Sequence, residues 1–153
     1  MDTTAGCSPV APTLLVRRAV PAAERDVAAL LRDVPIDPPE VADLIRRRGV
    51  FVLADLTLPL SARPVAAAAF RYHRPTATAQ LAGVGVLVTL RRRGLGGRLL
   101  TGALTLLRAE GFARVDASAA SGGAGASLLA SAGFAADGDA VRAGGCSRFA
   151  LVL

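Results

Sequence analysis

The stretch from Val84 to Leu100 constrains the fold of this chain more than any other part of the sequence. Residues 84–88 are apolar and mostly β-branched, as in a strand, and from Leu99 onward leucines recur at the three- and four-residue intervals of one helix face. Between them lies a turn with glycine at positions 94, 96 and 97. We therefore predict a strand, a tight turn and a helix in direct succession.

The predicted turn is suited to binding a phosphate. Glycine lets a ligand approach the main chain closely, and the free amides at a helix start point outward with the positive end of the helix dipole behind them. Neighbouring arginines add attraction for an anion. The predicted phosphate-binding residues are Arg91, Arg92, Arg93, Gly94, Leu95, Gly96, Gly97 and Arg98.

Two common phosphate motifs fit this turn less well. A dinucleotide-binding Gly-x-Gly-x-x-Gly would need glycine at Leu99, and a P-loop would need Gly-Lys-Ser/Thr in a chain that has no lysine. A basic helix start that binds no ligand is the structural alternative.

The composition indicates one domain. The 153 residues suffice for a hydrophobic core, with residues 1–12 expected as a loose tail and 13–153 as the domain. The net charge of +6 favours anionic partners, such as a phosphate-bearing small molecule, nucleic acid or acidic lipid. Two distant cysteines suggest neither a disulfide framework nor a metal site, and no signal peptide or membrane-length apolar run is evident, so we expect a cytoplasmic protein.

Periodicity and turn residues give the order of the remaining elements. The expected strands are 13–20, 50–56, 63–72, 78–88, 113–119 and 146–153, and the expected helices are 22–34, 37–49, one that follows Gly97 and ends near Gly111, and 126–132. Residues 117–145 have low-complexity character. The run Arg46–Arg48 closes the second helix, where positive charge complements the helix dipole; a nucleic-acid patch is the alternative.

The order Arg91-x-x-Gly94-x-Gly96, after a hydrophobic strand, resembles the coenzyme A pyrophosphate loop of the GNAT superfamily of N-acetyltransferases. A second match is Leu129-x-x-x-Gly133-Phe134, about 37 residues after the first motif, which is similar to the family's Tyr-x-x-x-Gly-Phe. The resemblance implies an α/β (α+β) GNAT-like fold over residues 13–153. That fold has a mixed, mostly antiparallel sheet flanked by helices, with a parallel β-α-β unit at the cofactor cleft.

The resemblance also implies an activity and a binding mode. The strand that carries Val84 and Val86 would bulge and diverge from the next parallel strand, leaving a gap for the pantetheine arm of acetyl-CoA. The Val86 amide would bind the thioester carbonyl, and the amides from Arg92 to Gly97 would bind the pyrophosphate. An amine acceptor, a small molecule or a protein, would attack the thioester directly in a ternary complex.

The chain departs from the family pattern at specific positions. Leu129 stands where the family's tyrosine protonates the leaving thiolate, Gly122 and Gly125 replace its asparagine and alanine, and Val88 replaces its proline. Losing a general acid costs about 10²–10⁴-fold, whereas placing the reactants together supplies an effective molarity of about 10⁵–10⁸ M. Acetyl transfer is therefore compatible with Leu129.

Few other residues could carry chemistry. Asp116 is a candidate base, with a solvated strand residue as the alternative interpretation, and Ser127 and Ser131 flank Leu129 as substitute acids. His73 is expected to be exposed in a turn, and Cys146 to be a small buried residue.

Two other functions stay open on the sequence. One is a coenzyme A-binding pseudoenzyme or sensor, which the loss of the tyrosine favours. The other is a basic nucleic-acid-binding module built on Arg46–Arg48 and Arg91–Arg93, although the chain has only five Phe and one Tyr for base stacking. The acceptor cannot be named, and the oligomeric state is open, a homodimer included.

Overall fold

A computed structural model describes residues 14–55, 63–91, 93–120, 123–141 and 146–153 of the chain. The strands are β2 (Leu14–Arg18), β3 (Val50–Asp55), β4 (Ala66–His73), β5 (Thr78–Val86), β6 (Arg114–Ala120), β7 (Ala135–Val141) and β8 (Cys146–Val152). The helices are α1 (Glu24–Leu30), α2 (Pro38–Arg46), α3 (Leu95–Ala109) and α4 (Ala124–Ser131), with 3₁₀ turns at Pro21–Ala23, Arg74–Thr76 and Val88–Leu90.

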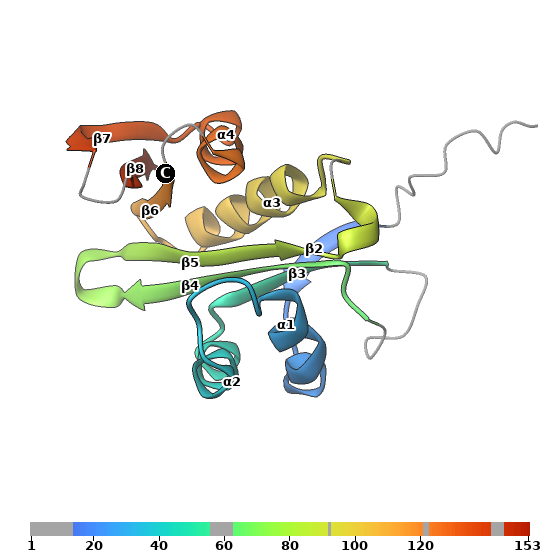
Figure 1. Cartoon of the computed structure of the whole chain (residues 1–153). Coiled ribbons are helices and arrows are strands. Elements are labelled where there is room, and N and C mark those ends of the chain that lie inside the picture. The colour runs from blue at the N-terminus through green and yellow to red at the C-terminus, as the bar shows by residue number, and fades with distance from the viewer. Residues whose placement is uncertain (1–13, 56–62, 92, 121–122, 142–145) are drawn as a thin grey trace, which may run out of the picture.

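The described strands form one sheet in the order β2-β3-β4-β5-β6-β8-β7. Every neighbouring pair is antiparallel except β5 and β6, which α3 connects as a parallel unit. Helices α1 and α2 lie on one face of the sheet, α3 crosses the other face, and α4 lies beside α3 and β6 (Figure 1). The expected α/β architecture with a mostly antiparallel sheet is confirmed.

Strand β4 separates two hydrophobic cores. Ala66, Ala68 and Phe70 pack toward α3, and Ala67 and Ala69 pack toward α1 and α2. All five are fully buried. Alternate residues of a strand face opposite sides, so an apolar run without polar interruptions suits a strand covered on both faces. The alanines keep this central strand thin enough for both helical layers to pack closely against it.

Several expected boundaries differ in the structure. The first helix, expected over 22–34, is a 3₁₀ turn followed by α1, and it ends at Leu30 before Pro35, which disfavours helical geometry at Val34. Strand β5 stops at Val86 rather than Val88, because the backbone turns into the 3₁₀ segment Val88–Leu90.

Strand β7 was not expected from the sequence. It lies within the low-complexity stretch 117–145 and is built mainly from alanine, aspartate and glycine, which have weak strand preference. Pairing with β8 supplies the hydrogen bonds that hold it in the sheet.

Candidate active site

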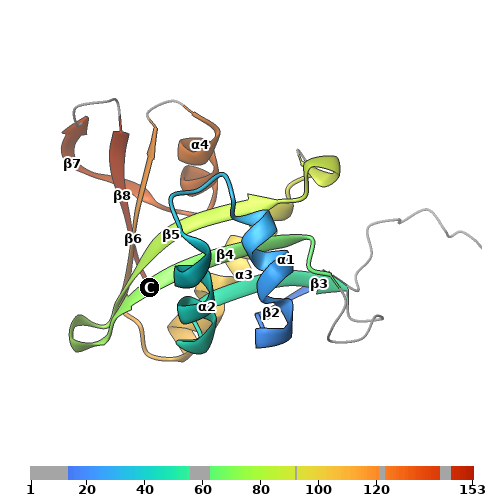
Figure 2. The same ribbon diagram turned by 60° about the horizontal axis from the view of Figure 1, so that its bottom comes forward.

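The β5–β6 pair, the single parallel pair among the described strands, diverges after three residues. β5 pairs with β6 at Thr78, Ala79 and Gln80, and the register ends there. On its other side, β5 stays paired with β4 to Val86, with a bulge that leaves Ala82 as the extra residue between Leu81 and Gly83. Figure 2 shows β5 and β6 meeting near the β4–β5 hairpin and separating toward α4. The bulge and the divergence expected from the family resemblance are both present.

Backbone groups of β5 point into this gap. The Leu87 N–H donates to Val65 O at 2.9 Å, so the N–H of the preceding residue, Val86, points away from β4 and toward the gap. The Val86 carbonyl accepts a hydrogen bond from Arg91 Nε at 3.2 Å. An N–H group is thus available at the position where the resemblance needs a carbonyl-binding donor.

The N-terminus of α3 opens at the end of the same gap. Gly94 precedes the helix with φ of 74°, in the left-handed region that favours glycine. The first bond of the helix ladder runs from Arg98 N to Gly94 O, so the amides of Leu95, Gly96 and Gly97 precede the ladder and point outward. The predicted turn therefore has the local geometry of an anion-binding helix start.

A cavity of about 750 Å³ occupies the gap between the diverged strands. It reaches from Gly96 on α3, past Leu128 and Leu129 on α4, to Leu30 at the end of α1 and to Asp33 and Pro35 in the segment after it. Four of the predicted binding residues line it: Val84, Val86, Arg91 and Gly96.

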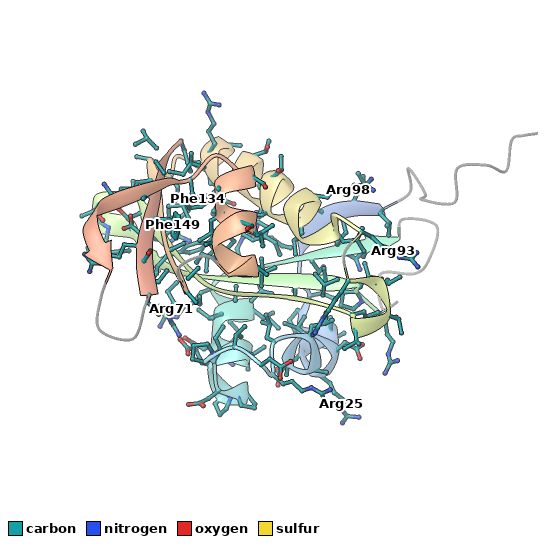
Figure 3. The ribbon with its side chains drawn as sticks, turned by 45° about the horizontal axis from the view of Figure 1, so that its top comes forward. Arg25, Arg71, Arg93, Arg98, Phe134 and Phe149 are labelled. Atoms are coloured by element: carbon teal, nitrogen blue, oxygen red, sulfur yellow. The ribbon has the colours of Figure 1, made fainter. Side chains whose placement is uncertain are left out.

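The other predicted loop residues lie around this cavity. Gly94, Gly97 and Arg98 line a smaller hollow of about 320 Å³ against Ser131 and Ala132, and Leu95 is buried in the core. Arg93 is exposed and points outward (Figure 3), and Arg92 lies outside the described residues. Arg98 Nη2 donates to Leu14 O at 2.7 Å, which ties α3 to β2.

The far side of the cavity carries charged groups that sequence reasoning did not single out. Arg71 donates to both oxygens of Glu40, at 2.7 and 3.0 Å, and lies between the sheet and α2 (Figure 3). These hydrogen bonds and the positive charge of Arg71 hold the pKa of the Glu40 carboxyl below its usual value. Asp33 Oδ2 lies 3.8 Å from Arg91 Nη2. No local motif marks these residues, because the fold alone brings them to the cavity.

Asp116 does not line the larger cavity. Its carboxylate accepts a hydrogen bond from Arg114 Nε at 2.6 Å, and both residues line a second cavity of about 430 Å³. The two cavities share Gln80 and Ser118. Asp116 is half-buried and forms an ion pair with Arg114. The structure therefore places this candidate base beside the larger cavity, with its carboxylate already paired.

Of the remaining candidate residues, some lie where the sequence predicted and others do not. Leu129 is buried at 3% exposure and lines the larger cavity, whereas Ser127 and Ser131 are exposed. His73 is exposed in its turn, as expected, and its Nδ1 lies 2.8 Å from Thr76 Oγ1. The expectation for Cys146 was wrong: it is exposed, because it begins β8 opposite the exposed Ala120 at the open end of the sheet.

Arg46 and Arg47, part of the charge run weighed as a nucleic-acid patch, both bind Asp43, at 3.2 and 2.8 Å. Among the residues that the structure describes, no group of His, Cys, Asp or Glu is arranged to hold a metal ion. No helix in the described ranges is long and apolar enough to cross a membrane.

Comparison with known proteins agrees with this geometry. A family model described as the acetyltransferase (GNAT) family matches residues 24–134, while no curated protein sequence matches the chain. The fold is similar to that of the IAA acetyltransferase from Bacillus cereus, with a TM-score of 0.69 and 17% identity over 92% of this chain and 99% of that one.

Two further solved structures share the fold. The ribosomal-protein-alanine N-acetyltransferase from Brucella melitensis has a TM-score of 0.68 and 19% identity over 92% of this chain and 100% of its own. The N-acetylglutamate synthase from Neisseria gonorrhoeae, complexed with coenzyme A and N-acetyl-glutamate, has a TM-score of 0.70 and 17% identity over 92% of this chain but only 35% of its own. The family model spans well over half of the sequence, and this chain belongs to the GNAT acetyltransferase family, whose usual cosubstrate is acetyl-CoA.

Proposed function

We propose that this protein transfers an acetyl group from acetyl-CoA to a primary amine, by direct attack of the amine in a ternary complex. The observation that carries the proposal is the cavity between β5 and β6. It has the N-terminus of α3 at one end and the charged segment after α1 at the other, so two molecules entering from opposite ends would meet beside β5.

The residues at the α3 end fit the diphosphate of coenzyme A. The amides of Leu95, Gly96 and Gly97 precede the helix ladder, and Gly96 presents no side chain to the cavity. Arg91 lines the same space, and Arg92 and Arg93 continue the loop in sequence. Hydrogen bonds from amides to a charged phosphate, aided by the helix dipole, make this the proposed diphosphate site.

The Val86 N–H is the proposed donor to the acetyl carbonyl. Acetyl-CoA supplies an acetyl thioester whose leaving group is a stabilised thiolate. The amine nitrogen forms a bond to the acetyl carbon, the carbon–sulfur bond breaks, and its electrons stay on sulfur. The nitrogen loses one proton and the thiolate takes up one, so the step balances. A backbone donor fixed by β4 pairing stabilises the negative charge that develops on the carbonyl oxygen. Asp116 stays the candidate base.

A second candidate function is coenzyme A binding without turnover. Leu129 is apolar and lines the cavity at the position where the family carries a tyrosine acid. Among the described lining residues, Ser118 carries the single hydroxyl group. A site with no phenol near the departing sulfur favours this alternative.

Substitution of Gly96 tests the diphosphate site. An alanine Cβ at Gly96 would meet Leu128 at 3.6 Å and Val86 at 3.8 Å, which is ordinary contact, so Gly96→Ala is the matched control for folding. Gly96→Asp places a negative charge at a helix N-terminus, which favours the helix but repels a phosphate. We expect Gly96→Asp to weaken acetyl-CoA binding about 100-fold or more and Gly96→Ala to weaken it little, by calorimetry. Equal affinity of wild type and Gly96→Asp for acetyl-CoA would show that the diphosphate does not bind at this helix start.

Turnover separates the two candidate functions. Thioester consumption is measured over a broad panel of amines for wild type, Leu129→Tyr and Leu129→Phe. If thiolate departure limits the rate, the phenol raises turnover about tenfold or more while phenylalanine, of similar size, does not. Leu129 is buried, so both variants cost about 1–3 kcal/mol of folding free energy, and thermal melts monitor this cost. No thioester consumption by wild type or Leu129→Tyr, with acetyl-CoA bound, establishes the second candidate.

A further inference from the structure

The second cavity, of about 430 Å³, lies on the sheet face opposite α3. On β6, Val115 and Ala117 belong to the core beneath α3, so the alternate residues Arg114, Asp116 and Ser118 face the other way. Helices α1 and α2 pack on β3 and β4 and leave this part of the face open (Figure 1). The lining residues are His73, Thr78, Gln80, Arg114, Asp116, Ala117, Ser118, Arg148 and Phe149.

The second cavity adjoins the larger cavity, which contains the proposed reaction site. Gln80 is the last residue of β5 that pairs with β6, and it lines both cavities together with Ser118. The two spaces therefore meet where the strands begin to diverge. A molecule held in the second cavity would enter the larger cavity past Gln80 and Ser118, which line both.

The described residues that line the second cavity carry a net positive charge. Asp116 is bound by Arg114 at 2.6 Å, so these two charges offset each other. Arg148 faces Ser118 across the β6–β8 pair, on the same side of the sheet, and its side chain is exposed. Arg71, which lines the adjoining cavity, is likewise paired with Glu40 of α2. Among the described charged residues that line this cavity, Arg148 thus supplies the unbalanced charge.

We infer that the second cavity is the acceptor site and that the acceptor is an amine carrying an anionic group, a carboxylate or a phosphate, which Arg148 binds. This inference rests on the proposed acetyl transfer. Arginine offers a planar pair of donors to carboxylate and phosphate oxygens, and the Arg114–Asp116 pair adds further polar groups at the wall of the cavity. The anionic end would lie at β8, and the amine would point to the gap between β5 and β6.

The experiment compares matched acceptors with wild type, Arg148→Gln and Arg25→Gln. Arg25 is an exposed arginine on α1 that points away from the sheet (Figure 3), so its variant controls for loss of one positive charge. The acceptors are the protein amino acids and their carboxamides, for a carboxylate, and O-phosphoethanolamine and ethanolamine, for a phosphate. Binding of each to the protein with coenzyme A is followed by ligand-observed NMR, and transfer is followed by thiol release.

We expect wild type to bind members of one anionic set and to discriminate against their neutral partners. Arg148→Gln should raise the Kd and KM for those anionic amines about tenfold, with kcat and acetyl-CoA affinity little changed, and Arg25→Gln should behave as wild type. Equal binding of anionic and neutral amines, or equal loss in both arginine variants, overturns the inference and leaves the proposed transfer intact. Arg148-dependent binding of anionic amines without thiol release supports the anion site and overturns the transfer.

Discussion

At the scale of single residues, Tyr72 of β4 contacts the segments that follow α2 and α3. It is the only tyrosine of the chain; its ring lies 4.6 Å from that of Phe112, and its hydroxyl donates to Arg48 O at 2.7 Å. Burial raises the pKa of the Tyr72 phenol above its usual value near 10.0, although the neighbouring Arg18 acts in the opposite direction.

This pKa predicts how stability depends on pH. The unfolded chain loses the phenol proton near pH 10.0, whereas the folded chain holds it to higher pH. Below pH 10.0 the phenol is protonated in both states, and its contribution to the free energy of unfolding is constant. The free energy of unfolding then falls as pH rises through the folded pKa, because the unfolded chain has already lost the proton. The chain has no lysine to obscure this range. Absorbance titration should place the folded transition above that of a urea-unfolded sample; a folded midpoint at or below the unfolded one would contradict the assignment.

At the end of α2, Arg48 and Gly49 have different structural roles. The sequence suggested Gly49 as the helix stop, but Arg48 is the residue in the left-handed region, with φ of 63°. The bonds Arg48 N to Ile45 O and Gly49 N to Leu44 O close the helix in a Schellman arrangement. Gly49 is needed for another reason: a Cβ there would lie 2.4 Å from Phe70 O. The sequence thus predicted where α2 ends, but the need for glycine at position 49 comes from packing against β4.

At the scale of elements, the start of α3 depends on Gly94, and this gives a stability prediction. A side chain at Gly94 meets no atom within 4 Å, yet φ of 74° is unfavourable for alanine. Gly94→Ala should therefore lower the free energy of unfolding by about 1 kcal/mol.

Gly97→Ala is the matched control within the same turn. Position 97 is helical, and a Cβ there would meet Leu128 at 3.8 Å, an ordinary contact. Its stability should be unchanged or slightly higher, since alanine is the better helix former. Urea unfolding of both variants checks the pair. Equal destabilisation would mean that general packing of the turn, rather than the backbone angle at Gly94, is responsible.

The contact of α1 with β5 is also made by glycines. A Cβ at Gly83 would lie 2.8 Å from the Val34 side chain, and one at Gly85 would overlap Leu30 O. Neither glycine is the bulged residue of β5. The bulge is at Ala82, and the glycines instead let the end of α1 and the segment after it lie against the strand. This close approach is what brings Asp33 and Pro35 to the cavity.

At the scale of the whole molecule, the active-site cavity results from strands that change partners. β5 keeps its pairing with β4 along its length, while β6 beyond Asp116 pairs with β8 alone. Helices on both faces then bound the gap, since Gly96 of α3 approaches Leu128 of α4 on one side and α1 lies against Gly85 on the other. The cavity belongs to the arrangement of several elements, and no single segment contains it.

The sequence alone determined the succession of strand, glycine turn and helix around Gly94 and the order of most elements, because periodicity and backbone preferences act over a few residues. The bounds differ, since α3 begins at Leu95 rather than after Gly97. Tertiary structure decided the rest. β7 lacks strong strand residues and exists through its pairing with β8. Arg71, Gln80 and Ser118 share a cavity wall although they lie on three different strands, and Arg148 joins Arg114 and Asp116 through the β6–β8 register. Such proximity is set by long-range pairing, which local patterns do not encode.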